Sequence, residues 1–436
     1  MTNAPPEVLT FGCRLNSVES ETMQRLASSA GLCDTVIVNT CAVTAEAERQ
    51  AGQAIRRLKR ESPHVRIIVT GCASQIDAQK YAAMKEVDAV IPNDAKMQAE
   101  SFTNLVAAKP SPPKGGRGLG EGGLGCLYPQ SPPSPQPLSP QEGERGLAMQ
   151  RAFVQIQTGC NYHCTFCIIP YGRGASRSTP IDAITAQVRA CADKGFNEIV
   201  LTGVDIASYG QDLPDRPTLG SLIRRVLQAV PTLPRLRLSS LDPAAIDEDL
   251  WDLVAQEPRL MPHLHLSLQA GDDMILKRMK RRHSRDDIFR LCARARHLRP
   301  DIVFGADIIA GFPTETDAMF ANTHDLVEKC SLTWLHVFPY SARKLTPAAK
   351  MPQVHGAIRK ERADRLRALG ERAARRHYES LIGTTVKVLV ENNGIGCTPH
   401  FAKLKLQGQA RVGGIVEARC VRGENDAVVA EVVKVV

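Results

Sequence analysis

The stretch Gly159-Cys160-Asn161-Tyr162-His163-Cys164-Thr165-Phe166-Cys167 places three cysteines on one short segment, with the spacing Cys-x3-Cys-x2-Cys. It follows a strand candidate at residues 152–157. Three closely spaced thiolates can hold three irons of a cubane iron–sulfur cluster, which leaves the fourth iron without a protein ligand. An open position on a catalytic metal is where a substrate or cofactor binds. The segment therefore predicts a catalytic iron–sulfur cluster.

A zinc site is the alternative for this segment. Zinc usually takes four ligands, often as two Cys-x2-Cys pairs, and no second pair follows here. His163 lies between the cysteines as a possible fourth ligand, but the local geometry would be awkward. The spacing favours the iron–sulfur interpretation.

Strand and helix patterns alternate on the C-terminal side of this segment, as far as residue 351. Helical patterns, for example at 181–194, 219–230 and 285–298, separate the strand candidates. The strand candidates lie at residues 152–157, 198–202, 235–239, 263–267, 302–309 and 334–338. Six such units in a row predict a parallel barrel or partial barrel, with cofactor chemistry at the C-terminal ends of its strands.

The first hundred residues predict a second parallel α/β sheet. Its strand candidates are residues 7–11, 35–38, 65–70 and 87–91, with helices expected at 17–30 and 45–61. Cys13, Cys41 and Cys72 each follow one of these strands. Because the carboxyl ends of parallel strands converge, the three thiols are candidates for a second cluster.

Buried, unreactive cysteines are the alternative for this second set, since free cysteine is often buried as a small apolar residue. Three cysteines at matched strand ends, two of them after a glycine, favour a site. The remaining cysteines show no such pattern, and we interpret them as core or surface residues: Cys33, Cys191, Cys292, Cys330, Cys397 and Cys420.

Two further segments complete the domain organisation. Residues 110–146 hold nine prolines and nine glycines and predict a disordered linker, in which Cys126 takes no part in chemistry. After a long helix at 355–381, short β-branched runs predict a small antiparallel barrel. The predicted domains are an N-terminal α/β sheet domain (1–108), the linker (109–148), a partial barrel (149–380) and the small barrel (381–436).

Composition narrows the class of protein. The 13 cysteines are an odd number and no secretion signal begins the chain, which argues against a disulfide framework and for metal chemistry. No apolar run approaches the roughly 20 residues of a membrane helix, so we expect a cytoplasmic protein without a membrane partner. A net charge of +9 suits a nucleic-acid partner. The basic runs at 277–283 and 359–376 are either solvated helix faces or phosphate contacts.

The three-cysteine segment, including Phe166, resembles the radical S-adenosylmethionine (SAM) superfamily. The resemblance implies that SAM chelates the open iron and that one electron from the cluster cleaves it to a 5′-deoxyadenosyl radical. The whole chain resembles the methylthiotransferases of that superfamily. This implies two [4Fe–4S] clusters and a C-terminal RNA-binding barrel called TRAM. The implied ligands are Cys13, Cys41 and Cys72 for the auxiliary cluster, and Cys160, Cys164 and Cys167 for the radical SAM cluster.

Later strand ends also resemble the family, at residues 201–205, 265–271 and 306–315. From these segments Gly203, Ser267 and Gln269 are candidates to line the SAM pocket. Each of the three has an equal alternative as a turn or core residue. The sequence assigns no catalytic acid or base.

Three motifs resemble the MtaB-type branch of the family, which modifies N6-threonylcarbamoyladenosine in tRNA: residues 13–16, 237–243 and 338–343. The family usually has Glu at the place of Asp242, and its linker is usually shorter than residues 110–146. The resemblance implies methylthio transfer to C2 of the adenine at position 37, next to the anticodon. An unpaired anticodon-loop base suits this, because it can be splayed into a pocket. A flavodoxin or ferredoxin would supply electrons.

Three alternatives differ from this interpretation in substrate or in class. Two keep the chemistry and change the substrate, to isopentenyladenosine in tRNA or to an aspartate of a ribosomal protein; the branch motifs argue against both. The third is a non-catalytic iron–sulfur electron carrier that binds RNA. Such a carrier would need neither a barrel nor a cluster segment that lacks a fourth ligand.

Overall fold

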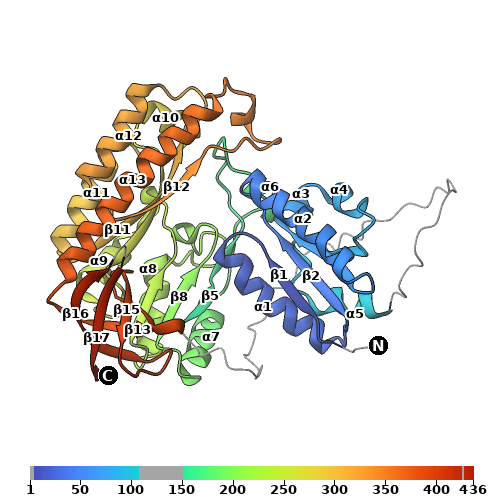
Figure 1. Ribbon diagram of the computed structural model, residues 1–436, viewed down its shortest axis with the longest axis horizontal. Helices are drawn as coiled ribbons and strands as arrows, with labels where there is room; N and C mark the ends of the chain where they lie inside the picture. The colour runs from blue at the N-terminus through green and yellow to red at the C-terminus, as the bar shows by residue number, and fades with distance from the viewer. Residues whose placement is uncertain (1–3, 108–150, 425–426) are drawn as a thin grey trace. The chain divides into compact units, whose positions relative to one another are not determined.

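The computed structural model describes residues 4–107, 151–424 and 427–436 (Figure 1). The chain divides into two compact units. Unit 1 comprises Met1–Gln136 and Tyr171–Gly174, and unit 2 comprises Pro137–Pro170 and Ala175–Val436. The predicted linker at 109–148, with Cys126, lies outside the described residues.

Unit 1 contains a four-stranded parallel sheet, in the order β1-β2-β3-β4. All six residues of β2 are buried, as its apolar β-branched run predicts. The register pairs Thr10 with Asn39 and Thr40 with Gly71, so the first three strands end at one edge. The strands are β1 (Glu7–Thr10), β2 (Thr35–Thr40), β3 (Arg66–Gly71) and β4 (Ala89–Val90).

Helices cover this sheet and supply its core. Met23 of the first helix and Phe102 of the last pack with Ile37 and Ile68 of the central strands. The Thr44 side chain accepts from the backbone N–H of Ala47 and so caps the second helix. The helices are α1 (Arg14–Ser29), α2 (Ala45–Glu61), α3 (Cys72–Ile76), α4 (Ala78–Ala82) and α5 (Ala99–Ala107).

Unit 2 begins with the predicted partial barrel, and its six parallel strands are confirmed. They form two three-stranded sheets, β5-β8-β9 and β10-β11-β12, joined by a parallel bridge between Leu241 and Leu266. The strands are β5 (Ala152–Gln155), β8 (Glu198–Thr202), β9 (Arg235–Leu238), β10 (His263–Gln269), β11 (Val303–Ala310) and β12 (Trp334–Pro339).

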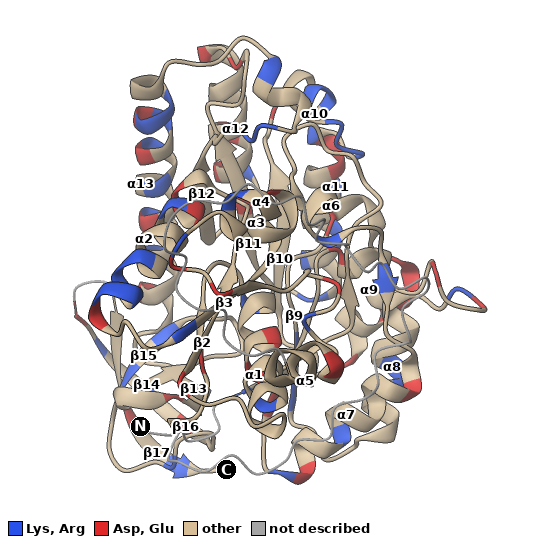
Figure 2. Ribbon diagram, turned by 90° about the vertical axis from the view of Figure 1, so that its right-hand side faces the viewer, with Lys and Arg blue, Asp and Glu red and all other residues tan. Residues whose placement is uncertain are grey.

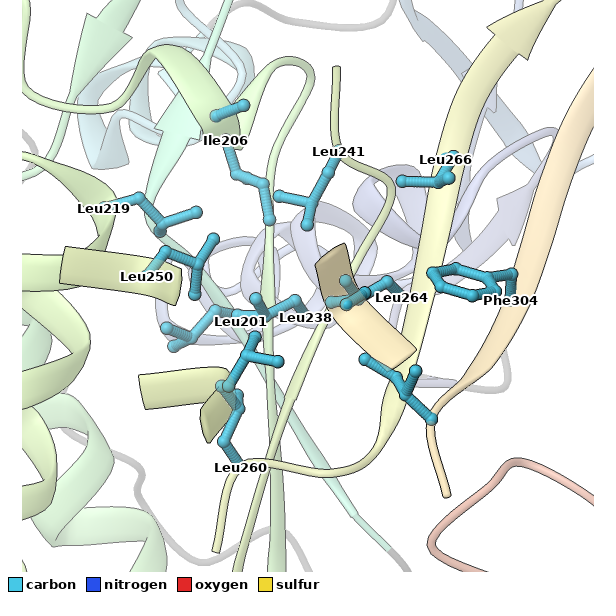
Figure 3. Packing of buried hydrophobic residues seen from close by; sticks show 14 of the residues in the cluster. Leu201, Ile206, Leu219, Leu238, Leu241, Leu250, Leu260, Leu264, Leu266 and Phe304 are labelled. Atoms are coloured by element: carbon cyan, nitrogen blue, oxygen red, sulfur yellow. The ribbon is translucent and has the colours of Figure 1, made fainter. Parts of the chain in front are cut away.

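The helices between these strands cover one face of both sheets (Figure 1). Leu238, Leu264 and Phe304, from three successive strands, pack in one buried cluster with helix residues such as Leu219 and Leu250 (Figure 3). Each such side chain contributes roughly 1.5–3 kcal/mol by leaving water. The helices are α7 (Ile181–Asp193), α8 (Leu219–Ala229), α9 (Glu248–Gln256), α10 (Asp273–Met279), α11 (Arg285–Leu298) and α12 (Asp317–Lys329).

The C-terminal part of unit 2 is a closed five-stranded barrel that follows the long helix α13 (Gly356–Leu381). The three-residue strand β14 was not predicted, because so short a run carries no alternation to detect. One pair, β15 with β17, is parallel, and the other pairs are antiparallel. The strands are β13 (Thr385–Val390), β14 (Ile395–Cys397), β15 (Lys403–Gln407), β16 (Ile415–Glu424) and β17 (Ala427–Val435).

Glu198 anchors the two parts of unit 2 to each other. Its fully buried carboxylate lies 3.1 Å from Arg237, 3.3 Å from Arg151 and 3.6 Å from Arg235. Arg237 also donates to the backbone oxygens of Thr398 and Pro399 in the small barrel. The motif residue Arg237 therefore has a structural partner in the C-terminal barrel. In the described part of the chain, no helix has both the length and the apolar character needed to cross a bilayer.

Candidate functional site

The segment with Cys160, Cys164 and Cys167 is fixed at both ends by hydrogen bonds. It leaves the strand β6 (Gln157–Thr158), which pairs with β7 (Arg177–Ser178). The Gln157 amide donates to the Gly159 oxygen and accepts from the N–H groups of Val204 and Asp205 after β8. Further along, the Thr165 hydroxyl donates to the Arg278 oxygen at 2.7 Å. These bonds hold the segment at the C-terminal end of the partial barrel.

The three thiols of this segment are close enough to influence one another's ionisation. Burial raises the pKa of Cys160 to about 11 and that of Cys167 to about 12, and the neighbouring cysteines raise both further. Such thiols ionise only when a cationic group binds them, because metal coordination deprotonates a thiol. Arg281 Nη1 lies 3.6 Å from Cys164 Sγ and adds positive charge. The donor set fits an iron–sulfur cluster.

Arg281 also connects this segment to the strand ends of the barrel. Its Nη2 donates to the Ser267 oxygen at 2.7 Å and lies 3.3 Å from Asp242 Oδ2. Arg282 lies 3.1 Å from the same carboxylate and stacks over the Tyr162 ring. Burial would raise the pKa of Asp242, but Arg281 and Arg282 hold it below its usual value.

The basic run at 277–283 therefore differs from both expectations stated for it. The Arg281 side chain is only 8% exposed, and His283 is buried. Arg278 donates to the Thr314 hydroxyl at 2.8 Å. Much of this run contacts the cluster segment and the neighbouring strand ends, so it is not a solvated helix face as a whole.

The three SAM-pocket candidates lie at the C-terminal ends of β8 and β10. A Cβ at Gly203 would lie 2.7 Å from the Gln157 oxygen, so the site accepts only glycine there. Ser267 is on the opposite face of β10 from the core residue Leu266. Gln269 has φ of 72°, a left-handed conformation that is uncommon for a residue with a side chain and clusters at functional sites.

A second polar group spans the three strands β10, β11 and β12. Asp307 Oδ1 lies 3.1 Å from His265 Nε2 and 3.3 Å from His336 Nδ1. Burial would raise the pKa of Asp307, but hydrogen bonds from the two imidazoles hold it well below its usual range. The face of the sheet that carries Ser267 is therefore polar and charged below the cluster segment.

In unit 1 the structure brings Cys13, Cys41 and Cys72 together at the ends of β1, β2 and β3. Close backbone approach makes this possible at two glycines with positive φ. A Cβ on Gly12 would lie 2.5 Å from Cys41 Sγ, and one on Gly71 would lie 2.4 Å from the Thr40 oxygen. Each of these glycines precedes a cysteine of the set.

These three thiols also match the chemistry of a cluster site. Burial raises the pKa of Cys41 to about 11, and the other two cysteines raise it further. Burial likewise raises the pKa of Cys72, whereas Arg173 and Lys96 act in the opposite direction. Cys13 is exposed, which leaves one side of the set accessible from solvent. The donor set fits a metal cluster here too.

The chain matches two family models and a set of curated proteins. Residues 154–327 match the Radical SAM superfamily, and residues 7–92 match the Uncharacterized protein family UPF0004. The chain is 47% identical over 428 residues to the "Threonylcarbamoyladenosine tRNA methylthiotransferase MtaB" of Rickettsia prowazekii, which covers 96% of this chain and 95% of that protein. The chain belongs to the MtaB-type radical SAM methylthiotransferases.

More distant relatives carry two names. The MtaB protein of Aquifex aeolicus is 31% identical and covers 93% of this chain and 98% of its own. A "tRNA-2-methylthio-N(6)-dimethylallyladenosine synthase" of Cereibacter sphaeroides is 32% identical and covers 94% of each chain. Membership of the radical SAM methylthiotransferases implies a [4Fe–4S] cluster and SAM. The two family models span the two cysteine sets of this methylthiotransferase.

Sequence reasoning missed several residues of this methylthiotransferase that contact its cysteine sets. Arg281 stands in the basic run, where its neighbours hid it. Lys96 and Arg173, which act on Cys72, carry no pattern that links them to it. One signal was present for Arg173, because it follows the cluster segment by six residues.

Proposed function

We propose that this chain is a tRNA methylthiotransferase that converts N6-threonylcarbamoyladenosine at position 37 to its 2-methylthio derivative. The observation that carries the proposal is the 47% identity to an MtaB protein along almost the whole of both chains. The proposal gains support from the Cys160, Cys164 and Cys167 segment, whose three thiols leave one cluster iron for SAM. Dimethylallyladenosine is the second candidate substrate, since a synthase of that name is 32% identical.

At the radical SAM site, Cys160, Cys164 and Cys167 would hold a [4Fe–4S] cluster. The cluster and SAM supply the one-electron chemistry when bound. The chain's own contribution is to hold the thiols in place through Gln157 and Thr165. Gly203, Ser267 and Gln269 would line the SAM pocket at the strand ends, with Ser267 fixed by its bond from Arg281.

At the auxiliary site, Cys13, Cys41 and Cys72 would hold a second [4Fe–4S] cluster. Support comes from the matched strand ends and the close approach of Gly12 to Cys41. Burial of Cys41 and Cys72 would keep their thiols neutral without a bound cation. This second cluster would serve the transfer of sulfur to the substrate.

RNA binding would use basic surface on each unit. On unit 1, Lys and Arg gather along α2 (Figure 2). A shallow hollow there is lined by Arg56, Arg57, Lys59, Arg60 and Lys85. On unit 2, α13 carries cations, but several pair with acidic neighbours, for example Lys360 with Asp364 at 3.0 Å. The hollow on α2 is thus the stronger candidate for phosphate contact.

The reaction would take place in the cytoplasm, where tRNA is available. A flavodoxin or ferredoxin would supply the electron to the radical SAM cluster. The ribosomal-protein substrate and the non-catalytic electron carrier lose weight, because the relatives named above are tRNA-modifying enzymes by their names.

An assay with two tRNAs tests the proposal. The reconstituted full chain is incubated with SAM, dithionite and a sulfide source, together with a tRNA that carries either threonylcarbamoyladenosine or isopentenyladenosine. Mass spectrometry of the nucleosides should reveal the methylthio product from the first tRNA only. Product from the second tRNA alone would overturn the substrate assignment, and the Cys160→Ala variant should give none.

A further inference from the structure

A buried set of charges lies next to the three thiols of unit 1. Arg173 and Lys96 both contact the carboxylate of Glu19, at 2.6 Å each. The three side chains are 3%, 1% and 4% exposed. Two cations share one anion here, so this trio carries one net positive charge in a site that water does not reach.

Arg173 comes from a distant part of the sequence. Glu19 lies in α1 and Lys96 follows β4, whereas Arg173 ends the short helix α6 (Ile169–Arg173). The chain leaves unit 2 after Pro170, contributes Tyr171–Gly174 to unit 1 and returns at Ala175. A piece of the segment that follows Cys167 is therefore part of unit 1.

This piece contacts the structure around all three cysteines. Arg173 Nη2 donates to Asn16 Oδ1 at 2.6 Å, and Asn16 donates in turn to the Phe11 and Thr40 oxygens, near Cys13 and Cys41. The Asn93 amide donates to the Gly172 oxygen at 2.6 Å and lies 3.9 Å from Cys72 Sγ.

Gly172 forms part of the wall beside Cys72. A Cβ on Gly172 would lie 3.0 Å from the Cys72 Cβ, so no larger side chain fits without a shift of that cysteine. The residues on either side of the contact thus determine where Cys72 lies. Unit 1 has a complete cysteine site only when Tyr171–Gly174 is in place.

The charge of the trio matches that of a cluster with three cysteine ligands. An uncompensated buried charge is costly, so the net positive charge calls for an anionic partner. Three neutral thiols offer none. A [4Fe–4S]²⁺ core held by three thiolates carries one net negative charge, which is the complement of the trio.

We propose that Arg173, held by Glu19 and Lys96, is a positioning residue of the auxiliary cluster site and raises the reduction potential of that cluster. A nearby cation favours the reduced state, because reduction adds negative charge. The inference rests on the auxiliary cluster of the proposed function. It adds that a segment which follows the radical SAM cysteines completes the site.

The test uses the full chain with Cys160, Cys164 and Cys167 all changed to Ala, so that only the auxiliary site binds iron. In this background Arg173→Gln is compared with Arg57→Gln, an exposed arginine of unit 1 whose partner is Glu61. Iron content and the midpoint potential, followed by electron paramagnetic resonance, are the two readouts. Arg173→Gln should change the oxidised-to-reduced ratio at a fixed potential about tenfold, a fall of 59 mV for one electron. Arg57→Gln should leave the potential unchanged.

The Arg173→Lys variant separates charge from packing. It keeps the cation but loses the paired contacts to Glu19 and Asn16. A potential near that of the unchanged chain in Arg173→Lys, with reduced iron content, supports the proposal. Loss of iron from Arg173→Gln with unchanged circular dichroism also supports the positioning role. Loss of the fold together with the iron in both variants would overturn it and leave a structural ion pair.

The two levels of the account fail differently. If the triple-alanine chain with Arg173 intact binds no cluster, the auxiliary cluster of the proposed function is wrong. If it binds a cluster whose iron content and potential are the same in Arg173→Gln, only the role of Arg173 is wrong.

Discussion

The guanidinium of Arg281 lies 3.6 Å from Cys164 Sγ and donates to the Ser267 oxygen at 2.7 Å. One side chain thus joins the cluster segment to the end of β10, where two of the SAM-pocket candidates lie. Asp242 lies 3.3 Å from the same guanidinium and fixes its orientation. Because this contact spans cluster and pocket, its loss should affect SAM cleavage.

We therefore predict that Arg281→Gln slows reductive cleavage of SAM by tenfold or more. A charge-assisted hydrogen bond is worth about 1.5–3 kcal/mol, and its loss also leaves Asp242 with one cation fewer. The measurement is 5′-deoxyadenosine formed per minute in the presence of dithionite. Arg290→Gln, which changes an exposed arginine paired with Asp287, is the control and should stay within twofold. An unchanged rate in Arg281→Gln would contradict the assigned role.

Iron content tests the two cysteine sets separately. Cys160→Ala and Cys72→Ala should each remove roughly half of the iron of the reconstituted chain, since each loses a ligand of one four-iron cluster. Cys33→Ala changes an exposed cysteine outside both sets and should retain all of it. Iron and zinc are measured together by mass spectrometry. Zinc in place of iron at Cys160 would support the alternative that the spacing left open.

The Glu198 cluster should dominate the stability of unit 2. Glu198→Gln leaves Arg151, Arg235 and Arg237 buried without their anion. Breaking a buried ion pair in this way costs about 3–5 kcal/mol of unfolding free energy. Glu248→Gln, which breaks an exposed pair with Arg294, should cost less than about 1 kcal/mol. Urea denaturation of the metal-free chain makes the comparison, and equal effects of the two substitutions would refute it.

His283 should make stability fall in mild acid. Burial, together with Arg281, lowers its pKa from 6.5 to about 4. Between these values the unfolded chain binds a proton that the folded chain does not, so stability is complete above pH 6.5 and declines as the pH falls toward 4. The decline from this group is up to about 3 kcal/mol.

The slope of unfolding free energy against pH is the readout for His283, with the metal-free chain as sample. His283→Gln should flatten the slope between pH 4 and 6.5. The exposed His64 is the control, and His64→Gln should leave the slope as it is. A slope unaffected by His283→Gln would show that other groups cause the acid sensitivity.

Sequence patterns predicted most of the architecture. The helix at 45–61 and the strand at 198–202 lie within the predicted bounds, because periodicity and burial are local properties. The three cysteines after the strands of unit 1 were grouped correctly, since parallel strands end at one edge. The strand predicted at 87–91 shrinks to Ala89–Val90, because an edge strand needs fewer pairs.

Contacts between distant residues escaped prediction. Arg173 and Glu19 are 154 positions apart, and no pattern along the chain links them. Arg281 stands in a run of cations that reads as solvent-exposed, yet the turn after α10 directs it toward Cys164. Gln269 gives no sign in the sequence of its positive φ. Such features depend on how the chain folds back on itself, and only the structure reveals them.

The central claim is that the chain adds the methylthio group to threonylcarbamoyladenosine, and nucleoside analysis of tRNA tests it most directly. The gene is deleted in its host, and bulk tRNA is analysed by mass spectrometry. The account predicts loss of 2-methylthio-N6-threonylcarbamoyladenosine with accumulation of its precursor, restored by the wild-type gene and not by Cys160→Ala. An unchanged level of that nucleoside, with loss of the isopentenyladenosine derivative instead, would contradict it.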